Sequence, residues 1–294
     1  TGDTSRFPQI SVSVPESSKL SRPIPRQDPD AVHSELTGIG GFFERMLRRF
    51  KPLAHGLALL PLAAVFISLL GVSLVPGIAL FQTVTETGRD WPTLAQYLAW
   101  GMSLAAGYFA YGFSLIVVIP AACFLFRAYP REFRGSYYST ETGRWYFSNG
   151  LLYLVRYSFL EFITPTPFNN LFYMLMGMKI GRGVHINSTH ISDPAMIELG
   201  DKVTIGGSAV IAAHYAQAGY LIIARVRIGR GATIGLRATI MGDVVIGDGA
   251  RVLPNSVVLP KTRIAAGETW GGVPAVRLDP ESLKAIGAAN EYQL

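Results

Sequence analysis

The chain has 294 residues, a net charge of +6, 16% charged residues and 49% hydrophobic residues. Its mean hydropathy of +0.30 is too high for an ordinary soluble protein, so we expect part of the chain to lie in lipid. The basic residues adjoin apolar segments rather than forming a face interleaved with aromatics, which excludes nucleic acid as the expected partner and favours an anionic membrane surface.

Residues 1–38 are polar and rich in proline and serine, which predicts a disordered tail or linker. A short basic amphipathic stretch follows, and then two uncharged runs at about residues 53–81 and 94–126. Each run is long enough to cross a bilayer, and small residues in the second permit close helix packing. We therefore predict a transmembrane helical hairpin within residues 39–144. The alternative is a buried hairpin of a soluble protein.

Positive charge precedes the first run and follows the second, whereas the link between the two runs has mixed charge. The basic residues are Arg45, Arg48, Arg49 and Lys51 before the first run, and Arg127, Arg131 and Arg134 after the second. By the positive-inside rule, both ends of the hairpin face the cytoplasm. The expected location is thus the cytoplasmic membrane, with the following domain on its cytoplasmic side.

Residues 145–178 are apolar and aromatic, but charges and prolines interrupt them. No part has 18 residues without charge, so amphipathic helices lying in the membrane interface are the favoured prediction. A third membrane crossing is the alternative.

A large residue occupies every sixth position of the next region. The series is Ile228, Ile234, Ile240, Ile246, Val252, Val258, Ile264 and Trp270. A small or β-branched residue stands four places after most of these anchors. Neither a helix nor a single strand has this period, but a solenoid in which each unit supplies one short strand and one turn does.

The six-residue pattern begins less regularly at Ile180, and the predicted solenoid covers residues 179–278, followed by a tail at 279–294. The pattern loses its register over residues 212–225. An insertion that interrupts a solenoid usually loops out on one face, often the binding face. No Cys/His cluster has zinc spacing and the single cysteine, Cys123, allows no internal disulfide, so no metal is expected.

These features resemble the hexapeptide-repeat acyltransferases. The motifs are the anchored units, ELGDKVTIG at 198–206, a looped-out segment with a histidine, and AAGETWGGVPAVRL at 265–278. The resemblance implies a left-handed parallel β-helix, a homotrimer with each site between two subunits, and acetyl-CoA or another pantetheine thioester as the acyl donor. With the apolar runs ahead of YMLMGMKIGRGVHIN, the chain is similar to a membrane-anchored subgroup: membrane-bound sugar O-acetyltransferases and the C-terminal module of polylysine-synthetase-type nonribosomal peptide synthetases.

Acyl transfer needs a base for the acceptor proton, and His214 is the candidate. A neutral imidazole can accept a proton at neutral pH, and His214 lies in the register break, where the resemblance places the catalytic histidine. The resemblance also implies that Asp193 contacts an acceptor hydroxyl, with a turn residue before Pro194 as the alternative. His190 is a further candidate for the acceptor pocket, or a plain residue of the coil.

The C-terminal coils are expected to bind the donor. The resemblance places Gly235, Leu236 and Pro254 along the pantetheine arm. Three basic residues are candidates for the nucleotide phosphates: Lys261, Arg263 and Arg277. The alternative for each is a solvated charge on a turn.

The leading functional hypothesis is a membrane-anchored acyltransferase that acts on a hydroxyl of a saccharide or lipid-linked acceptor. The alternative is the C-terminal, peptide-bond-forming module of a membrane nonribosomal peptide synthetase, in which a carrier-bound aminoacyl thioester reacts with an amine. A start at Thr1 and the linker-like residues 1–38 fit that alternative. A membrane scaffold whose solenoid binds a partner is a third, non-enzymatic hypothesis.

Overall fold

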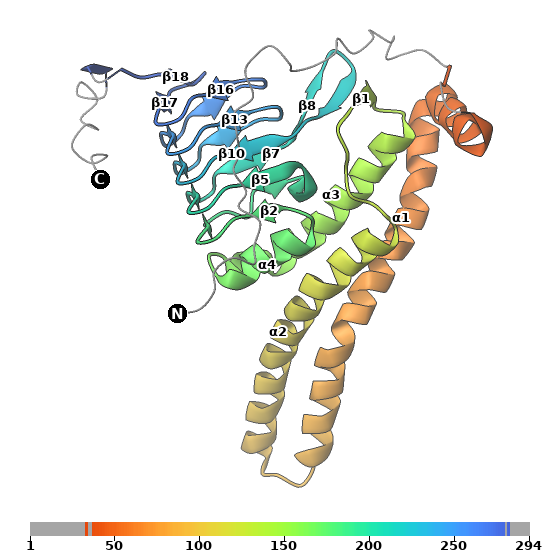
Figure 1. Cartoon of the computed structure of the whole chain (residues 1–294). Helices are drawn as coiled ribbons and strands as arrows, with labels where there is room; N and C mark the ends of the chain where they lie inside the picture. The colour runs from red at the N-terminus through yellow and green to blue at the C-terminus, as the bar shows by residue number, and fades with distance from the viewer. Residues whose placement is uncertain (1–32, 35–36, 280, 283–294) are drawn as a thin grey trace, which may run out of the picture. The chain divides into compact units, whose positions relative to one another are not determined.

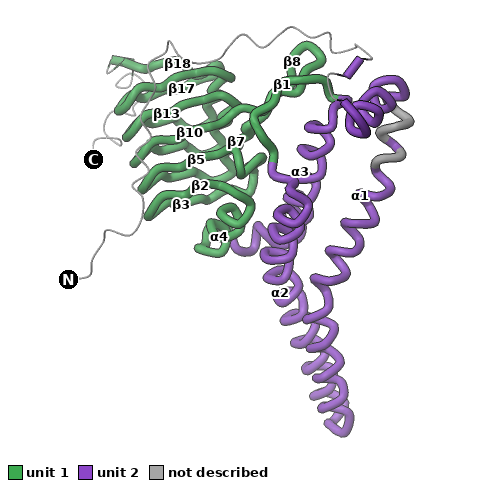
Figure 2. Tube along the Cα trace, turned by 45° about the vertical axis from the view of Figure 1, so that its right-hand side comes forward, with its two compact units in different colours: residues 1–30, 130–137, 164–294 green, residues 31–129, 138–163 purple. Residues whose placement is uncertain are grey.

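The computed structural model describes residues 33–34, 37–279 and 281–282, so the two predicted tails lie largely outside the described residues. The chain divides into two compact units (Figure 2). One contains residues 130–137 and the chain from residue 164 onward, and the other contains residues 31–129 and 138–163.

The second of these units is helical. Its elements are α1 (Gly38–Thr87), α2 (Thr93–Leu125), α3 (Thr140–Ser158) and the 3-10 helix η1 (Leu160–Ile163). The helices α1 and α2 form a long hairpin (Figure 1). Their backbones approach closely where glycines face each other, because a Cβ on Gly77 would lie 2.8 Å from the carbonyl oxygen of Gly107. The sequence thus uses small residues to bring the two helices together.

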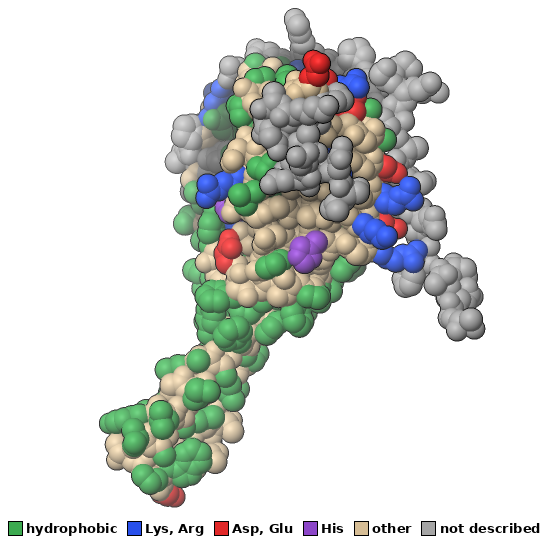
Figure 3. Space-filling view, turned by 90° about the vertical axis from the view of Figure 1, so that its left-hand side faces the viewer, with side chains coloured by type: hydrophobic (Ala, Val, Ile, Leu, Met, Phe, Trp, Pro, Cys, Tyr) green, Lys and Arg blue, Asp and Glu red, His purple; other side chains and the backbone are tan. Residues whose placement is uncertain are grey.

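The hairpin has an apolar surface. An 18-residue window reaches a mean hydropathy of 2.3 within Leu59–Thr87 and of 2.0 within Thr93–Leu125, and both helices are long and apolar enough to cross a membrane. The face visible in Figure 3 shows hydrophobic side chains along the hairpin and charge only at its tip.

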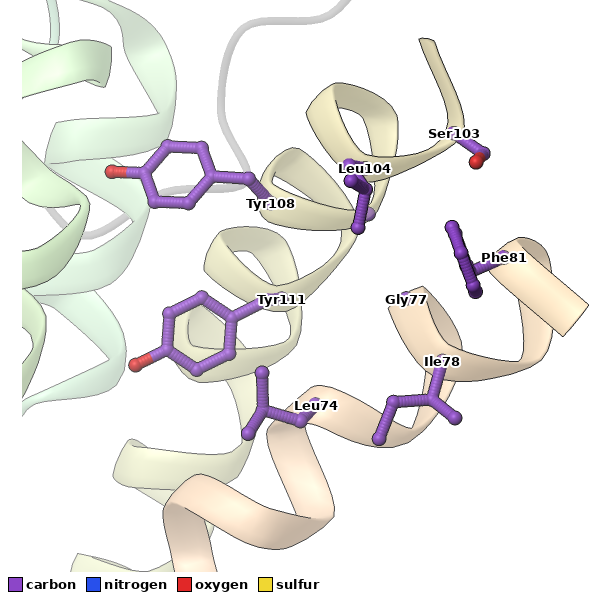
Figure 4. A pocket seen from close by; sticks show the side chains of 9 residues that line it. Leu74, Gly77, Ile78, Phe81, Ser103, Leu104, Tyr108 and Tyr111 are labelled. Atoms are coloured by element: carbon purple, nitrogen blue, oxygen red, sulfur yellow. The ribbon is translucent and has the colours of Figure 1, made fainter. Parts of the chain in front are cut away.

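A groove of about 400 Å³ opens between these two helices (Figure 4). Its lining residues are Leu74, Gly77, Ile78, Phe81, Ser103, Leu104, Gly107, Tyr108 and Tyr111. The lining contains no carboxylate, histidine, cysteine or basic side chain, so the groove offers no base for acyl transfer.

The other unit is the predicted solenoid, and the parallel β-helix is confirmed (Figure 1). Its strands are short and in chain order comprise β2 (Lys179–Ile180), β3 (His185–Ile186), β4 (Ile191–Ser192), β5 (Ile197–Leu199), β6 (Thr204–Ile205), β7 (Val210–Ala212), β10 (Val226–Ile228), β11 (Thr233–Ile234), β12 (Thr239–Ile240), β13 (Val245–Ile246), β14 (Arg251–Val252), β15 (Val257–Val258), β16 (Arg263–Ile264), β17 (Thr269–Gly271) and β18 (Val276–Arg277). A 3-10 helix, η2 (Pro194–Met196), lies between β4 and β5.

Three parallel ladders form the walls of the solenoid. Their strand orders are β16-β13-β10-β5-β2, β17-β14-β11-β6-β3 and β15-β12-β7-β4, and β18 adds an antiparallel edge to the second ladder. From Ile228 onward the register pairs residues eighteen positions apart, such as Ile228 with Ile246 and Ile246 with Ile264. Three six-residue units therefore complete one coil.

The anchors predicted from the sequence form the core of the solenoid. The seven from Ile228 to Ile264 are at most 2% exposed, and the small residues Ala232, Ala238 and Ala250 are fully buried beside them. Trp270 is partly exposed and its indole Nε1 donates to Glu268 (2.9 Å). The core is therefore a close-packed stack of aliphatic side chains that sets the spacing of the turns.

The helix α4 (Pro167–Leu175) covers the first coil. Thr166 caps its start by accepting a hydrogen bond from the Phe168 N–H, and Pro167 stands at its first turn. The side-chain amides of Asn169 and Asn170 donate to the carbonyls of Ile186 (3.1 Å) and Val184 (2.9 Å). The helix thus satisfies backbone acceptors that a further coil would otherwise bond.

Candidate active site

The register break at residues 212–225 is a β-hairpin. It consists of β8 (His214–Gln217) and β9 (Tyr220–Ile223), which pair antiparallel. Ala218 and Gly219, which join them, both have positive φ, of 48° and 80°. Two such residues form the turn type that matches the twist of a hairpin. The chain therefore leaves one coil after β7 and rejoins the next at β10.

A third strand extends this hairpin. The strand β1 (Phe133–Ser136), which follows α2 in the chain, pairs antiparallel with β9 and gives the sheet order β1-β9-β8. Arg225, just after β9, contacts Glu132 with its guanidinium (3.3 Å), and the guanidinium of Arg134 lies 5.3 Å from the ring centre of Tyr220. A segment some ninety residues away in the chain thus braces the hairpin.

His214 and Asp193 meet at one corner of the solenoid. The Nδ1 atom of His214 lies 2.5 Å from Oδ2 of Asp193, although the two residues are 21 positions apart. The reason is the stacking of coils: β4 pairs with β7, with Ser192 opposite Ala212. Asp193 therefore leaves its strand directly beside the point where the hairpin begins.

The two members of this pair have different surroundings. The side chain of Asp193 is fully buried, whereas that of His214 is 24% exposed. The backbone of Asp193 is left-handed (φ 58°, ψ 53°), and Pro194 follows it at the start of η2. A buried carboxylate requires a hydrogen-bond partner, and His214 supplies one.

This contact defines the chemistry of the imidazole. A carboxylate at Nδ1 holds the tautomer in which Nδ1 bears the hydrogen, so the basic lone pair belongs to Nε2. The arrangement can therefore remove a proton at Nε2 and stabilise the imidazolium that results.

Tyr215 and the next coil support the root of the hairpin. A Cβ on Gly242 would lie 3.0 Å from the Ala213 carbonyl and 3.2 Å from the Tyr215 ring, so a larger residue there would crowd the root of the hairpin. Burial raises the pKa of the Tyr215 phenol, Asp243 raises it further, and Arg134 opposes them. Tyr215 is therefore a neutral phenol at neutral pH, and the sequence pattern gave no signal for it beyond its place after His214.

His190, the other predicted acceptor-site residue, is exposed. Its backbone N–H donates to Ser188 Oγ (3.0 Å) and its carbonyl accepts from the Ile211 N–H (3.1 Å). Within the part of the chain that the structure describes, its ring forms no hydrogen bond with His214 or Asp193.

The residues predicted along the donor arm lie at another corner. Gly235 must be glycine, because a Cβ there would lie 2.4 Å from the Pro254 nitrogen in the next coil. Leu236 is 51% exposed and Pro254 is exposed one coil further on. The three residues thus form a ridge of stacked turns with an apolar exposed surface.

The predicted phosphate-binding residues differ in their partners. Arg263 pairs with Asp243 (2.7 Å), and Arg277 lies 3.3 Å from Glu268. A hydrogen bond from Trp270 lowers the pKa of Glu268, with further help from the Ala265 N–H and Arg277. Lys261 is exposed on a turn with φ 68° and forms no ion pair among the described residues. Two of the three cations therefore already have a carboxylate beside them.

Asp193 was predicted from the sequence as an acceptor contact, but its carboxylate lies against the His214 ring. A signal for this pairing exists in the sequence, because Ile191 and Ile211 are equivalent anchors of successive coils and each residue of the pair follows its anchor closely. No group of three or more His, Cys, Asp or Glu residues that could hold a metal occurs within the described ranges.

Comparisons with known proteins agree with the repeat. Residues 222–260 match the family model of the bacterial transferase hexapeptide (six repeats). The chain is 28% identical over 109 residues to a δ-poly-L-ornithine synthetase of Acinetobacter baumannii, a match that covers 37% of this chain and 8% of that protein. It is 38% identical over 93 residues to the mitochondrial γ carbonic anhydrase 2 of Arabidopsis thaliana, covering 31% of this chain and 29% of that one. The chain therefore spans less than a third of the length of these curated relatives.

Solved structures give the same partial likeness. A hexapeptide-repeat acetyltransferase from Vibrio cholerae is 29% identical, with 35% of this chain and 62% of that chain covered and a TM-score of 0.32. A maltose O-acetyltransferase from Clostridium difficile 630 is 14% identical, with 50% and 92% covered and a TM-score of 0.38. The period of six, the three parallel ladders and the match at residues 222–260 together identify this solenoid as a hexapeptide-repeat parallel β-helix.

Proposed function

We propose that this chain is an acyltransferase in which His214, oriented by Asp193, is the general base. The observation that carries the proposal is the 2.5 Å contact between a fully buried carboxylate and a partly exposed imidazole. The hairpin holds this pair at a break in an otherwise regular solenoid.

The reaction moves an acyl group from a thioester to a hydroxyl. The acceptor oxygen attacks the thioester carbonyl while Nε2 of His214 takes its proton, and backbone N–H groups stabilise the oxyanion. When the tetrahedral intermediate collapses, the C–S bond breaks and the leaving thiolate takes the proton from the imidazolium. The products are an ester and a free thiol, and His214 returns to its neutral form.

The proposed donor is acetyl-CoA, or another pantetheine thioester. The apolar ridge of Gly235, Leu236 and Pro254 suits the pantetheine arm. Lys261 is the best candidate for a phosphate contact. The guanidinium groups of Arg263 and Arg277 already pair with the carboxylates of Asp243 and Glu268.

The proposed location is the cytoplasmic membrane, with α1 and α2 as the anchor and the solenoid on the cytoplasmic side. Their length and hydropathy, and the basic residues at the ends of the hairpin, support this.

The proposed acceptor is a saccharide or lipid-linked molecule, and the proposed assembly is a homotrimer. An active monomeric particle in detergent would contradict the trimer.

The test uses the full chain in detergent with radiolabelled acetyl-CoA and a panel of saccharide acceptors. His214→Ala is expected to lower kcat by about 10²–10⁴-fold while leaving folding intact. His185→Ala is the matched control, because His185 is an exposed histidine on β3 in the first coil. Near-normal turnover of His214→Ala would remove the assignment.

A second candidate is the peptide-bond-forming module of a nonribosomal peptide synthetase. The 28% identity to the δ-poly-L-ornithine synthetase favours it. Here the thioester is an aminoacyl group on a carrier, and His214 takes the proton of an attacking amine. Acetyl-CoA and a synthetic aminoacyl-pantetheine are supplied in parallel, and product bonds are treated with hydroxylamine, which cleaves esters and leaves amides. Amide formed from the aminoacyl donor alone would favour this candidate over the first.

A further inference from the structure

We propose that residues 38–50 form a second membrane contact, an amphipathic helix that lies along an anionic lipid surface. The proposal rests on the proposed membrane anchoring by α1 and α2. It adds a helical segment that lies on the membrane and does not cross it. The surface that this segment contacts is the headgroup region of a bilayer that contains anionic lipid.

The first observation is a break in α1. Lys51 has φ 9° and ψ −86°, which is outside helical geometry, so residues 38–50 are a helical segment of their own. In Figure 1 this segment, coloured red-orange, turns away from the axis of the long part of α1. A segment that bends where the long apolar helix begins can lie parallel to a membrane that the helix crosses.

The second observation is an exposed apolar stripe along this segment. Its members are spaced three or four residues apart, as on one face of a helix, and are exposed: Ile39 (77%), Phe42 (58%), Phe43 (50%), Met46 (37%) and Phe50 (50%). Large apolar side chains gathered in this way on one helix face indicate a surface that something covers.

The side of this segment opposite the stripe is buried, which fixes the orientation of the stripe. Glu44 is 5% exposed and pairs with Arg48 (2.5 Å), and Gly41 is buried on the same side. The guanidinium of Arg48 also donates to the His33 carbonyl. The buried side of the segment therefore makes contacts within the chain, whereas the aromatic side is exposed.

Charge decides the kind of partner. Arg45 and Arg49 are exposed and flank the stripe on one side, and the only acidic residue of the segment is Glu44, which is buried. Phenylalanines beside arginines suit the boundary between acyl chains and anionic headgroups. The stripe also precedes, in the same helix, a stretch apolar enough to cross a bilayer, so lipid is the surface that this segment would meet.

The experiment places single labels on the full chain in lipid vesicles. The background is Cys123→Ala, because Cys123 is the only cysteine. An environment-sensitive fluorophore is attached in turn at Phe43→Cys on the stripe, at Met102→Cys on α2 and at Arg182→Cys on an exposed turn of the solenoid. Vesicles of phosphatidylcholine, with and without phosphatidylglycerol, contain lipids with quenchers near the headgroup or deep in the acyl chains.

The expected result is quenching at position 43 by the shallow quencher, at position 102 by the deep quencher, and at neither depth at position 182. Removing phosphatidylglycerol, or introducing Arg45→Gln with Arg49→Gln, is expected to lower the quenching at position 43 several-fold and to leave position 102 unchanged. The signal at position 102 also shows that each variant is inserted.

Three outcomes would overturn the inference. A label at 43 that only an aqueous quencher reaches, with 102 deep in lipid, leaves the anchoring intact and removes the interfacial helix. A label at 43 that no quencher reaches means that protein covers the stripe. Equal quenching with and without anionic lipid removes the charge argument. If position 102 is not quenched by lipid, the proposed anchoring itself fails.

Discussion

The coils from Ile228 to Ile264 and the interrupted coil at residues 212–225 are built from the same repeat but differ in what they hold. In the regular coils every anchor is buried and pairs with the next coil. In the interrupted coil the chain leaves the stack, gains a strand from residues 133–136 and places His214 over Asp193. The comparison teaches that regularity supplies a rigid frame, whereas the candidate chemistry lies at the departure from it.

The largest expected effect comes from breaking the frame. Gly235→Val should abolish folding of the solenoid, because the new Cβ would lie 2.4 Å from backbone in the next coil. Gly249→Ala is the control: it has φ 66° with no atom within 4 Å, so it should cost only about 1–2 kcal/mol of backbone strain. Protease resistance and thermal unfolding in detergent measure both. A Gly235→Val protein as resistant as the parent would mean that the coils can separate.

The next effect lies in the interrupted coil. Asp193→Asn should keep the fold but lower kcat by about 10²–10⁴-fold, because a neutral amide no longer fixes the tautomer or stabilises the imidazolium. Asp201→Asn is the matched control, since Asp201 accepts from the Arg182 N–H (2.7 Å) on a stacking turn. The measurement is the steady-state kcat of both variants relative to the parent. Equal losses in the two would point to a general loss of packing.

These two regions also differ in how far the sequence predicts them. A period of six specifies the strands, the buried anchors and the out-of-phase segment, since each depends on neighbours within one coil. The pairing of β1 with β9 was not predicted, because contacts so far apart in the chain leave no periodic signal. The same holds for the capping amides of Asn169 and Asn170, which bond carbonyls 14 to 17 residues away. Asp193 was a candidate because of the family resemblance, but its contact with His214 became clear only with the register of β4 and β7.

A smaller effect separates buried anchors from the exposed ridge. Ile240→Ala should lower the free energy of unfolding by about 2–5 kcal/mol, because Ile240 is fully buried and the cavity cannot collapse against rigid coils. Leu236→Ala, at a 51% exposed position, should change it by about 0.5 kcal/mol or less. If Leu236 were as costly as Ile240, its ridge would be covered by another surface such as a second subunit.

The smallest effect concerns the ion pairs that tie β1 to the coils. Glu198 contacts Lys179 (2.9 Å), Arg225 (2.8 Å) and Arg227 (3.2 Å), and Arg225 also contacts Glu132. Burial raises the pKa of the Glu198 carboxyl, but Lys179 and the two arginines together outweigh it and hold the pKa below its ordinary value of 4.5. The charged carboxylate is therefore more favourable in the folded protein than in the unfolded chain.

The sign of the pH dependence follows from this lowered pKa. The stability that Glu198 contributes is fully present above the unfolded pKa and is lost as the pH falls through the folded one. Glu198→Gln should thus be about 0.5–1 kcal/mol less stable at neutral pH and should lose less on acidification below pH 4.5. Melting at pH 7 and at stepwise lower pH measures the difference, with Glu141→Gln as the control for an i,i+3 pair on α3. Parallel acid profiles for Glu198→Gln and the parent would show that this network does not brace the hairpin, and the bracing would then rest on the β1–β9 backbone pairing alone.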